Sequence, residues 1–114
     1  MGELRAGFHG DLEEILDAIV RLGATVIDLI PRVTAVLLEQ DLEGAEYVIL
    51  GDADVDTRAT SIEERALSLL ALQAPVAGDL RQVATALKIS SEMERSADLC
   101  CNICKAARRI YGHE

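Results

Sequence analysis

The chain has 114 residues, of which half are hydrophobic and only 3% aromatic, and its formal net charge is −9 at pH 7. This length predicts one domain, residues 1–114, that buries a modest core without disulfides or a structural metal. The negative charge argues against nucleic-acid binding, which needs a basic face. It suits metal cations or a basic patch on a protein partner.

No stretch of the sequence approaches the ~18–20 consecutive apolar residues that span a bilayer. No charged start followed by an apolar segment indicates a signal peptide. The three cysteines all lie between Cys100 and Cys104, and an odd number in one cluster does not predict a disulfide framework. We therefore expect a cytoplasmic protein that is not inserted directly into a membrane.

The first predicted helix begins near Leu12 and carries apolar residues at helical spacing as far as Leu37. Phe8 and His9 can already belong to it, whereas the mixed segment 1–10 as a whole is expected to fray. Pro31 removes one backbone hydrogen bond and clashes with the preceding turn. Because the apolar pattern continues in phase beyond Pro31, we expect a kink rather than a break.

A second helix is predicted from Asp41 to about Leu72. The Asp41 carboxylate can cap its first turn, and Glu43 adds negative charge where the helix dipole favours it. Gly51 costs this helix about 1 kcal/mol relative to alanine. It either leaves room for a group to approach beside Asp52 or is simply tolerated at the surface.

The segment Gln73-Ala74-Pro75 predicts the next turn. The residue before a proline avoids the helical region, and a proline suits the first turn of a new helix. The third helix is predicted to run to about Tyr111, with Gly112 as its stop. With no strand alternation in the chain, the fold class is all-α: three long helices in an antiparallel up-down-up bundle.

Two pairs of carboxylates fall on stripes that otherwise resemble a core. Asp52 and Asp56 are one turn apart in the second helix, and Glu94 and Asp98 are one turn apart in the third. The stripes have coiled-coil spacing and comprise Val48, Asp52, Val55, Ala59, Ile62, Ala66 and Leu69 in the second helix, and Leu80, Ala84, Leu87, Ser91, Glu94 and Asp98 in the third. Unpaired carboxylates on inward stripes are costly, so cations or hydrogen-bond donors are expected to meet them.

An antiparallel hairpin of the second and third helices brings the two pairs to the same height. At ~1.5 Å rise per residue their midpoints lie ~30 and ~33 Å from the turn. One interpretation is an all-oxygen site for Mg²⁺, Mn²⁺, Ca²⁺ or iron, with zinc possible. The other is a salt-bridged layer that uses Arg58, Arg81 and Arg95. Asn102, one turn beyond Asp98, is either a further oxygen ligand or a polar surface residue.

Enzymatic chemistry finds no support in the sequence, and we expect no catalytic residues. The Glu-x-x-His spacing of di-iron bundles is absent, and His9 and His113 lie near opposite ends of the chain. No phosphate-cradling loop, nucleophile elbow or catalytic triad is present. We interpret the cysteines as small buried hydrophobic residues rather than ligands, with Cys100 and Cys104 on one face and Cys101 turned toward the acidic stripe.

Several segments of the sequence are similar to a known family. They are Ala45-Glu46-Tyr47-Val48-Ile49 before Asp52-x-x-x-Asp56, Leu70-Ala71-Leu72-Gln73-Ala74-Pro75-Val76-Ala77-Gly78-Asp79-Leu80-Arg81, and Ala86-Leu87-Lys88-Ile89-Ser90-Ser91-Glu92-Met93-Glu94-Arg95 with Asp98. Together they resemble the first of the two repeats of PhoU, the bacterial phosphate-signalling regulator. The resemblance covers nearly the whole chain.

The resemblance implies a spectrin-repeat-like bundle in which two acidic motifs bind multinuclear iron or zinc clusters in some family members. The ligands implied here are Asp52, Asp56, Glu94 and Asp98, with Mg or Mn as further candidate ions. It also implies a regulatory adaptor that is not an enzyme. Such an adaptor links the ATPase subunit of a phosphate transporter to a sensor histidine kinase and restrains phosphate-starvation signalling. The alternative is a metal-free interaction domain whose carboxylates form salt bridges.

The chain departs from the PhoU pattern in two respects. PhoU has two bundles in tandem, so this sequence corresponds to a half-length member or a fragment. A lone bundle exposes a face that the second bundle would cover, so we expect a homodimer or a larger oligomer. Ala97 and Leu99 stand where many members have Gly and His, and any role of that histidine is therefore absent here.

Overall fold

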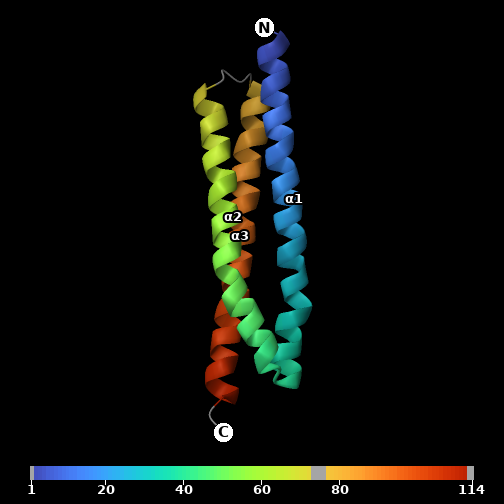
Figure 1. The fold of residues 1–114 in the computed structure, drawn as a ribbon, viewed down its shortest axis with the longest axis vertical. Coiled ribbons are helices and arrows are strands. Elements are labelled where there is room, and N and C mark those ends of the chain that lie inside the picture. Colours follow the sequence, from blue (N-terminus) through green and yellow to red (C-terminus); the bar gives the residue numbers. More distant parts are fainter. Residues whose placement is uncertain (1, 73–76, 113–114) are drawn as a thin grey trace.

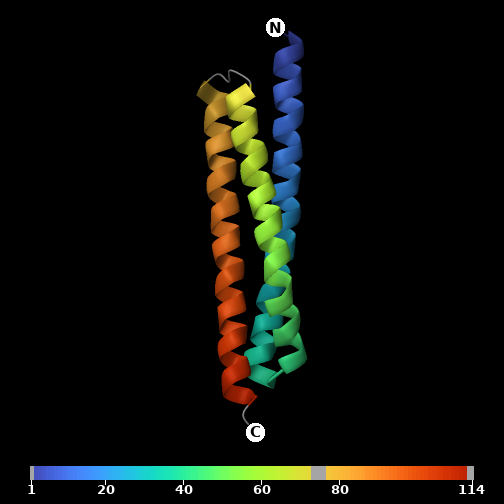
Figure 2. The ribbon, with the colours of Figure 1, turned by 60° about the vertical axis from the view of Figure 1, so that its left-hand side comes forward.

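The computed structural model describes residues 2–72 and 77–112, and side chains within 7–71 and 77–112. Three helices fill these ranges: α1 (Gly2–Glu39), α2 (Leu42–Leu72) and α3 (Ala77–Tyr111). They run antiparallel in succession and pack side by side in a rod of 66 × 19 × 18 Å (Figures 1 and 2). The predicted all-α, up-down-up three-helix bundle is confirmed. No helix in the described part of the chain is long and apolar enough to cross a membrane.

Helix α1 begins at Gly2, before the predicted start near Leu12, and includes Phe8 and His9. It continues through Pro31 without a break, as predicted. Pro31 lies on the exposed side of the helix. Val33 is buried beyond it, in phase with Leu29 before it. The packing stripe therefore survives the loss of one backbone hydrogen bond.

The junction of α1 and α2 uses the predicted cap. Gln40 ends α1 in the left-handed region, with φ of 55°, a common way to leave a helix. The Asp41 carboxylate accepts a 3.0 Å hydrogen bond from the Gly44 backbone N–H. The Asp41 carbonyl accepts another of 3.0 Å from Ala45. Two donors of the first turn are thereby satisfied.

The predicted turn at Gln73-Ala74-Pro75 lies outside the described residues. Helix α3 begins after it with Asp79 in its first turn, and the Asp79 carboxylate lies 3.2 Å from Nε2 of His9. At the other end the Gly112 backbone N–H donates to the Arg108 carbonyl at 2.9 Å. The predicted start of α2 and the predicted end of α3 are thus confirmed.

The buried line of α2 is the predicted one, but that of α3 is not. Leu80 and Ala84, which were assigned to the core, are exposed, and Leu87 is only half-buried. The buried residues of α3 are mostly small and lie about one position earlier: Asp79, Val83, Ala86, Ser90, Ala97, Cys101, Cys104 and Ala107. The apolar ones among them share one core with the buried line of α1, formed by Leu12, Ile15, Ile19, Leu22, Val26, Leu29, Val33 and Val36.

The correction in α3 has a steric reason. Small residues let the helix backbones approach closely, and bulkier side chains then lie at the edge of the contact. Gly23 of α1 shows such an approach, because a Cβ placed on it would stand 2.9 Å from the Met93 side chain of α3. The stripe predicted from Leu80 and Leu87 therefore lies at the edge of the α3 contact rather than at its centre.

Candidate metal centre

Asp52 occupies a core position of α2. Its neighbours on the stripe, Val48 and Val55, are each 2% exposed, and Asp52 itself is partly buried. Its Oδ1 atom is shielded from solvent and has no hydrogen-bond partner in the described part of the chain. An unsatisfied buried oxygen of this kind costs about 1–3 kcal/mol. A charged or hydrogen-bonding partner would remove that cost.

Other acids surround Asp52. Burial raises the pKa of its carboxyl most, and the charges of Asp56 and Asp98 raise it further. Lys105 and the Cys101 thiol have the opposite influence on the same pKa, but the net shift is upward. The Asp52 carboxylate is therefore held in surroundings that disfavour its negative charge.

Glu94 is in a similar position on α3. Burial raises the pKa of its carboxyl, as does a side-chain hydrogen bond with Asp56, and the charges of Asp56, Glu63 and Asp52 act in the same direction. Glu94 also lines a cleft of about 170 Å³ between α2 and α3, beside Glu63 and Ser90. The Glu94 carboxyl, like that of Asp52, is therefore held in surroundings that disfavour its negative charge.

Across the α2–α3 contact, the charges of Asp56 and Asp98 act on Asp52, and those of Asp56 and Asp52 act on Glu94. The four-residue ligand set itself stays a prediction. Asp56 and Asp98 are exposed, whereas Asp52 and Glu94 are partly buried. The donors approach in pairs, and no three Asp, Glu, His or Cys side chains among the described residues form a ready-made ion site. Asn102 is exposed one turn beyond Asp98.

The salt-bridged layer that the sequence allowed does not form. No ion pair joins Arg58, Arg81 or Arg95 to any of the four carboxylates within residues 7–71 and 77–112. Arg58 instead contacts Asp54 at 3.7 Å and donates a 2.9 Å hydrogen bond to the Thr25 hydroxyl. It therefore joins α2 to α1 and leaves the four carboxylates without an arginine.

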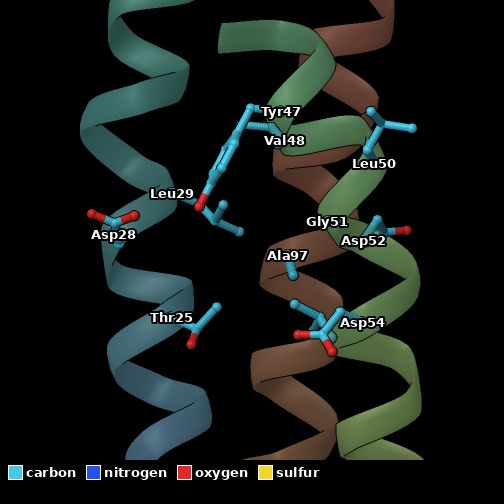
Figure 3. A pocket seen from close by; sticks show the side chains of 11 residues that line it. Thr25, Asp28, Leu29, Tyr47, Val48, Leu50, Gly51, Asp52, Asp54 and Ala97 are labelled. Atoms are coloured by element: carbon cyan, nitrogen blue, oxygen red, sulfur yellow. The ribbon is translucent and has the colours of Figure 1, made fainter.

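The Arg58 contacts border a second hollow, a pocket of about 360 Å³ lined by α1, α2 and Ala97 of α3 (Figure 3). In Figure 3, Asp54 turns toward α1, while the Asp52 carboxylate points away from α1. Gly51 also lines this pocket, and a Cβ placed on it would meet nothing within 4 Å. Gly51 is therefore not required to make room beside Asp52.

Three residues near the carboxylates were missed or given another role. Glu63 adds a further negative charge close to Glu94, and its position one turn beyond Ala59 of the α2 stripe was the available signal. Lys105, near the end of α3, also acts on Asp52. Cys101 was interpreted as a buried hydrophobic residue, and it is 2% exposed. The Cys101 thiol also lowers the pKa of Asp52, in line with its expected turn toward the acidic stripe.

Comparison with known proteins agrees with the resemblance to PhoU that the sequence shows. The family model described as the PhoU domain matches residues 19–107. The phosphate-specific transport system accessory protein PhoU homolog 1 of Mycobacterium leprae is 37% identical over 108 residues, covering 95% of this chain and 49% of the relative. The PhoU homolog of Aquifex aeolicus is 37% identical over 97 residues, covering 85% of this chain and 44% of the relative.

A PhoU homolog of Clostridium acetobutylicum is 35% identical over 108 residues, covering 94% of this chain and 49% of the relative. The chain spans about half the length of these curated relatives. No solved structure matches it. A domain match over most of the chain, with relatives above 30% identity along nearly all of it, settles the classification. This chain belongs to the PhoU family.

Proposed function

We propose that this protein is a regulatory adaptor of phosphate uptake that restrains phosphate-starvation signalling when phosphate is plentiful. The observation that carries the proposal is the PhoU domain match, together with relatives named as accessory proteins of the phosphate-specific transport system. Its partners in this proposal are the ATPase subunit of the transporter and the sensor histidine kinase. The protein acts in the cytoplasm and reaches the inner membrane through these partners.

The net charge of −9 supports docking on basic surfaces of such partners, because complementary potentials accelerate and orient association. In a bacterium that lacks its own PhoU, we expect this chain to restore repression of a phosphate-starvation reporter in phosphate-rich medium. Purified chain should also bind the isolated ATPase subunit. Full reporter expression together with no binding would reject the adaptor role.

We further propose that Asp52, Asp56, Glu94 and Asp98 bind iron or zinc, with Mg²⁺ or Mn²⁺ as weaker occupants. The unpaired Oδ1 of Asp52 and the raised pKa of the Glu94 carboxyl support this assignment. Oxygen donors without arginine partners suit hard and borderline cations. A bound ion would neutralise the carboxylates and fix α2 against α3. The bundle itself would orient the donors and needs no catalytic group.

Metal analysis of protein purified without chelator tests this assignment. We expect bound iron or zinc, lost when Glu94 and Asp98 are both replaced with alanine. Asp54→Ala is the matched control, because Asp54 is an exposed carboxylate of the same bundle that turns toward α1. Absence of metal, both as purified and after titration, would reject the metal centre. Equal loss in the control variant would show a general effect of charge.

The second candidate is a metal-free interaction domain. It is favoured by the exposure of Asp56 and Asp98, since solvent and salt screen exposed charges without any bound ion. In this case chelator-treated protein would bind the ATPase subunit as tightly as metal-loaded protein. The metal-centre proposal requires a measurable difference between the two.

A further inference from the structure

An open groove of about 370 Å³ lies between α1 and α3, and its described lining residues belong to these two helices alone. Gly23 and Ile27 line it from α1, and Ile89 and Met93 line it from α3. The two helices run in the same direction along the rod (Figure 1). They therefore share one face of the bundle, to which this groove belongs.

Both helices carry a row of outward residues with coiled-coil spacing along this face. The α1 row is Leu16, Val20, Gly23, Ile27, Ile30, Thr34 and Leu37, and the α3 row is Ile89, Glu92, Ser96, Leu99, Ile103, Ala106 and Ile110. The large apolar members of both rows are exposed. Two neighbouring seams of this kind are typical of helices that pack against further helices, yet these seams face solvent.

The face is large enough for a protein interface. From Val20 to Leu37 it is ~26 Å long at ~1.5 Å rise per residue, and two packed helices make it ~20 Å wide. The resulting ~500 Å² lies at the upper end of the ~300–600 Å² typical of the largest apolar patch on a monomer. Polar residues at its edges extend it toward the ~800 Å² that each partner contributes to a standard interface.

Charged residues at the edges of this face occur in opposite order on the two helices. Asp17 precedes Arg21 by one turn on α1, whereas Lys88 precedes Glu92 by one turn on α3. All four side chains are exposed. No ion pair among the described residues involves any of them. They are therefore available to a partner.

The two charged pairs also lie at the same height along the rod. A Cβ on Gly23 would contact Met93, and His9 contacts Asp79, so a residue of α1 is level with the residue of α3 that is 70 positions later. Asp17 and Lys88 are 71 positions apart, as are Arg21 and Glu92. Each unlike pair is thus level to within ~1.5 Å.

We propose that two copies of this chain associate in parallel through the α1–α3 face, about a twofold axis that runs along the rod. This axis places α1 of each copy opposite α3 of its partner without a change of height. Asp17 then meets Lys88 of the partner subunit, and Arg21 meets Glu92 of the partner subunit. The apolar rows supply most of the affinity, and the exposed pairs orient the two copies.

A second copy fits this face better than an unrelated helix does, because its own α1 carries the charges that complement α3. An antiparallel pair of copies places α1 against α1 and α3 against α3. Unlike charges then meet only when the axis passes near residues 19 and 90. That position moves the apolar ends of the rows, such as Leu37 and Ile110, away from each other. Only the parallel arrangement joins the unlike charges and the apolar rows at once.

Sedimentation velocity of two charge-reversal variants tests the arrangement. Asp17→Lys and Lys88→Glu should each raise the dimer dissociation constant by about tenfold or more, because two unlike contacts per dimer become like-charged. An equimolar mixture should restore the dimer. The new lysine of one variant then meets the new glutamate of the other, and the second edge keeps its native Asp17–Lys88 contact. This recovery also shows that both variants are folded.

A mixture that stays as monomeric as its two components overturns the parallel arrangement, because an antiparallel pair would place the new lysine against Arg21. Unchanged dimerisation of either variant alone overturns it too. A wild-type chain that remains monomeric at every concentration overturns the association itself.

Leu99→Glu tests the contribution of α3 to the face, and Leu67→Glu is the matched control. Leu99 is 55% exposed on α3, and Leu67 is 52% exposed on α2. Leu99→Glu should weaken the dimer by about tenfold or more, because its carboxylate would be desolvated in the contact. The control should dimerise like the wild-type chain. Equal weakening by both variants, or by neither, overturns the assignment of this face.

Discussion

The Asp52 carboxylate is an energetically unfavourable group within this bundle. The α2 stripe above and below it is valine, so its carboxylate lies where the surrounding packing would suit an apolar residue. Burial and the neighbouring acids raise its pKa, and Oδ1 is unpaired among the described residues. Retaining a charge there without metal weakens the fold, because a buried ion needs a partner of opposite charge.

Asp52→Asn should therefore stabilise the chelator-treated protein at pH 7. The amide removes the charge and can donate to Asp56 or Asp98. We expect a gain of about 1 kcal/mol, at the low end of the cost of an unpaired buried group, measured by urea unfolding. Asp54→Asn is the control and should change stability little, because Asp54 is exposed and its contact with Arg58 lies near the surface. A loss of stability in Asp52→Asn would show that its charge is already compensated.

Two glycines inside helices make a second comparison at the residue scale. A Cβ on Gly51 would meet nothing within 4 Å, whereas one on Gly23 would stand 2.9 Å from Met93. Gly51→Ala should raise the free energy of unfolding by up to ~1 kcal/mol through helix propensity. Gly23→Ala should gain less, because the end of the Met93 side chain must move. Thermal unfolding of both variants checks this, and equal gains would mean that Met93 adapts without cost.

At the scale of elements, the contact of α2 with α3 should determine how stability responds to pH. Folding raises the pKa of both Asp52 and Glu94 above their ordinary values of 3.8 and 4.5. A raised folded pKa means that their protonated forms are favoured on folding. That contribution is fully present below the ordinary values and is lost as the pH rises through the folded values.

The Asp52→Asn/Glu94→Gln variant isolates this effect. In chelator, its advantage over the wild-type chain should be largest at neutral pH and should shrink as the pH falls toward the ordinary values. Urea unfolding at a series of pH values measures it. An advantage that stays constant with pH would show that neither carboxyl is perturbed in the folded protein. An advantage that grows on acidification would show that folding lowers the pKa values of these carboxyls instead of raising them.

The elements also show what periodicity can and cannot predict. The boundaries of α2 and α3 follow from the Asp41 cap and from Gly112, which act within one turn and are visible in the sequence. The α3 contact depends instead on how closely two backbones approach. Small residues such as Ala97 and Cys101 allow that approach, yet they give a weak hydrophobic pattern. The stripe predicted from Leu80 and Leu87 therefore lies about one position away from the buried line of α3.

For the candidate site, the height of the carboxylates along the bundle could be predicted, whereas the residues around them could not. Its four carboxylates follow from two spacings and the length of a hairpin, because helix rise fixes height. The charged neighbours that act on them do not follow, since the influence of Glu63 and Lys105 depends on rotation about the helix axis and on burial. One residue of displacement in α3 decides whether Cys101 faces the core or the acids. Cys101 is buried, as the sequence indicated.

At the scale of the whole molecule, the outer side of α1 carries an apolar stripe. Val20, Ile27, Ile30 and Leu38 are 69%, 68%, 59% and 79% exposed. Large exposed apolar side chains on one face of a helix are typical of an interaction surface. The net charge of −9 opposes association of two copies at long range, but salt screens that repulsion.

We therefore expect the chain to self-associate through α1, and to do so more strongly as salt is added. Val20→Glu/Ile27→Glu should shift it toward monomer in sedimentation velocity, because each carboxylate would have to be desolvated in the interface. Leu50→Glu is the control, since Leu50 is 75% exposed but belongs to α2. Equal dissociation in the control would place the interface elsewhere, and a monomer at every salt concentration would reject self-association. Weaker association with added salt would indicate that charge pairs, rather than this stripe, hold the copies together.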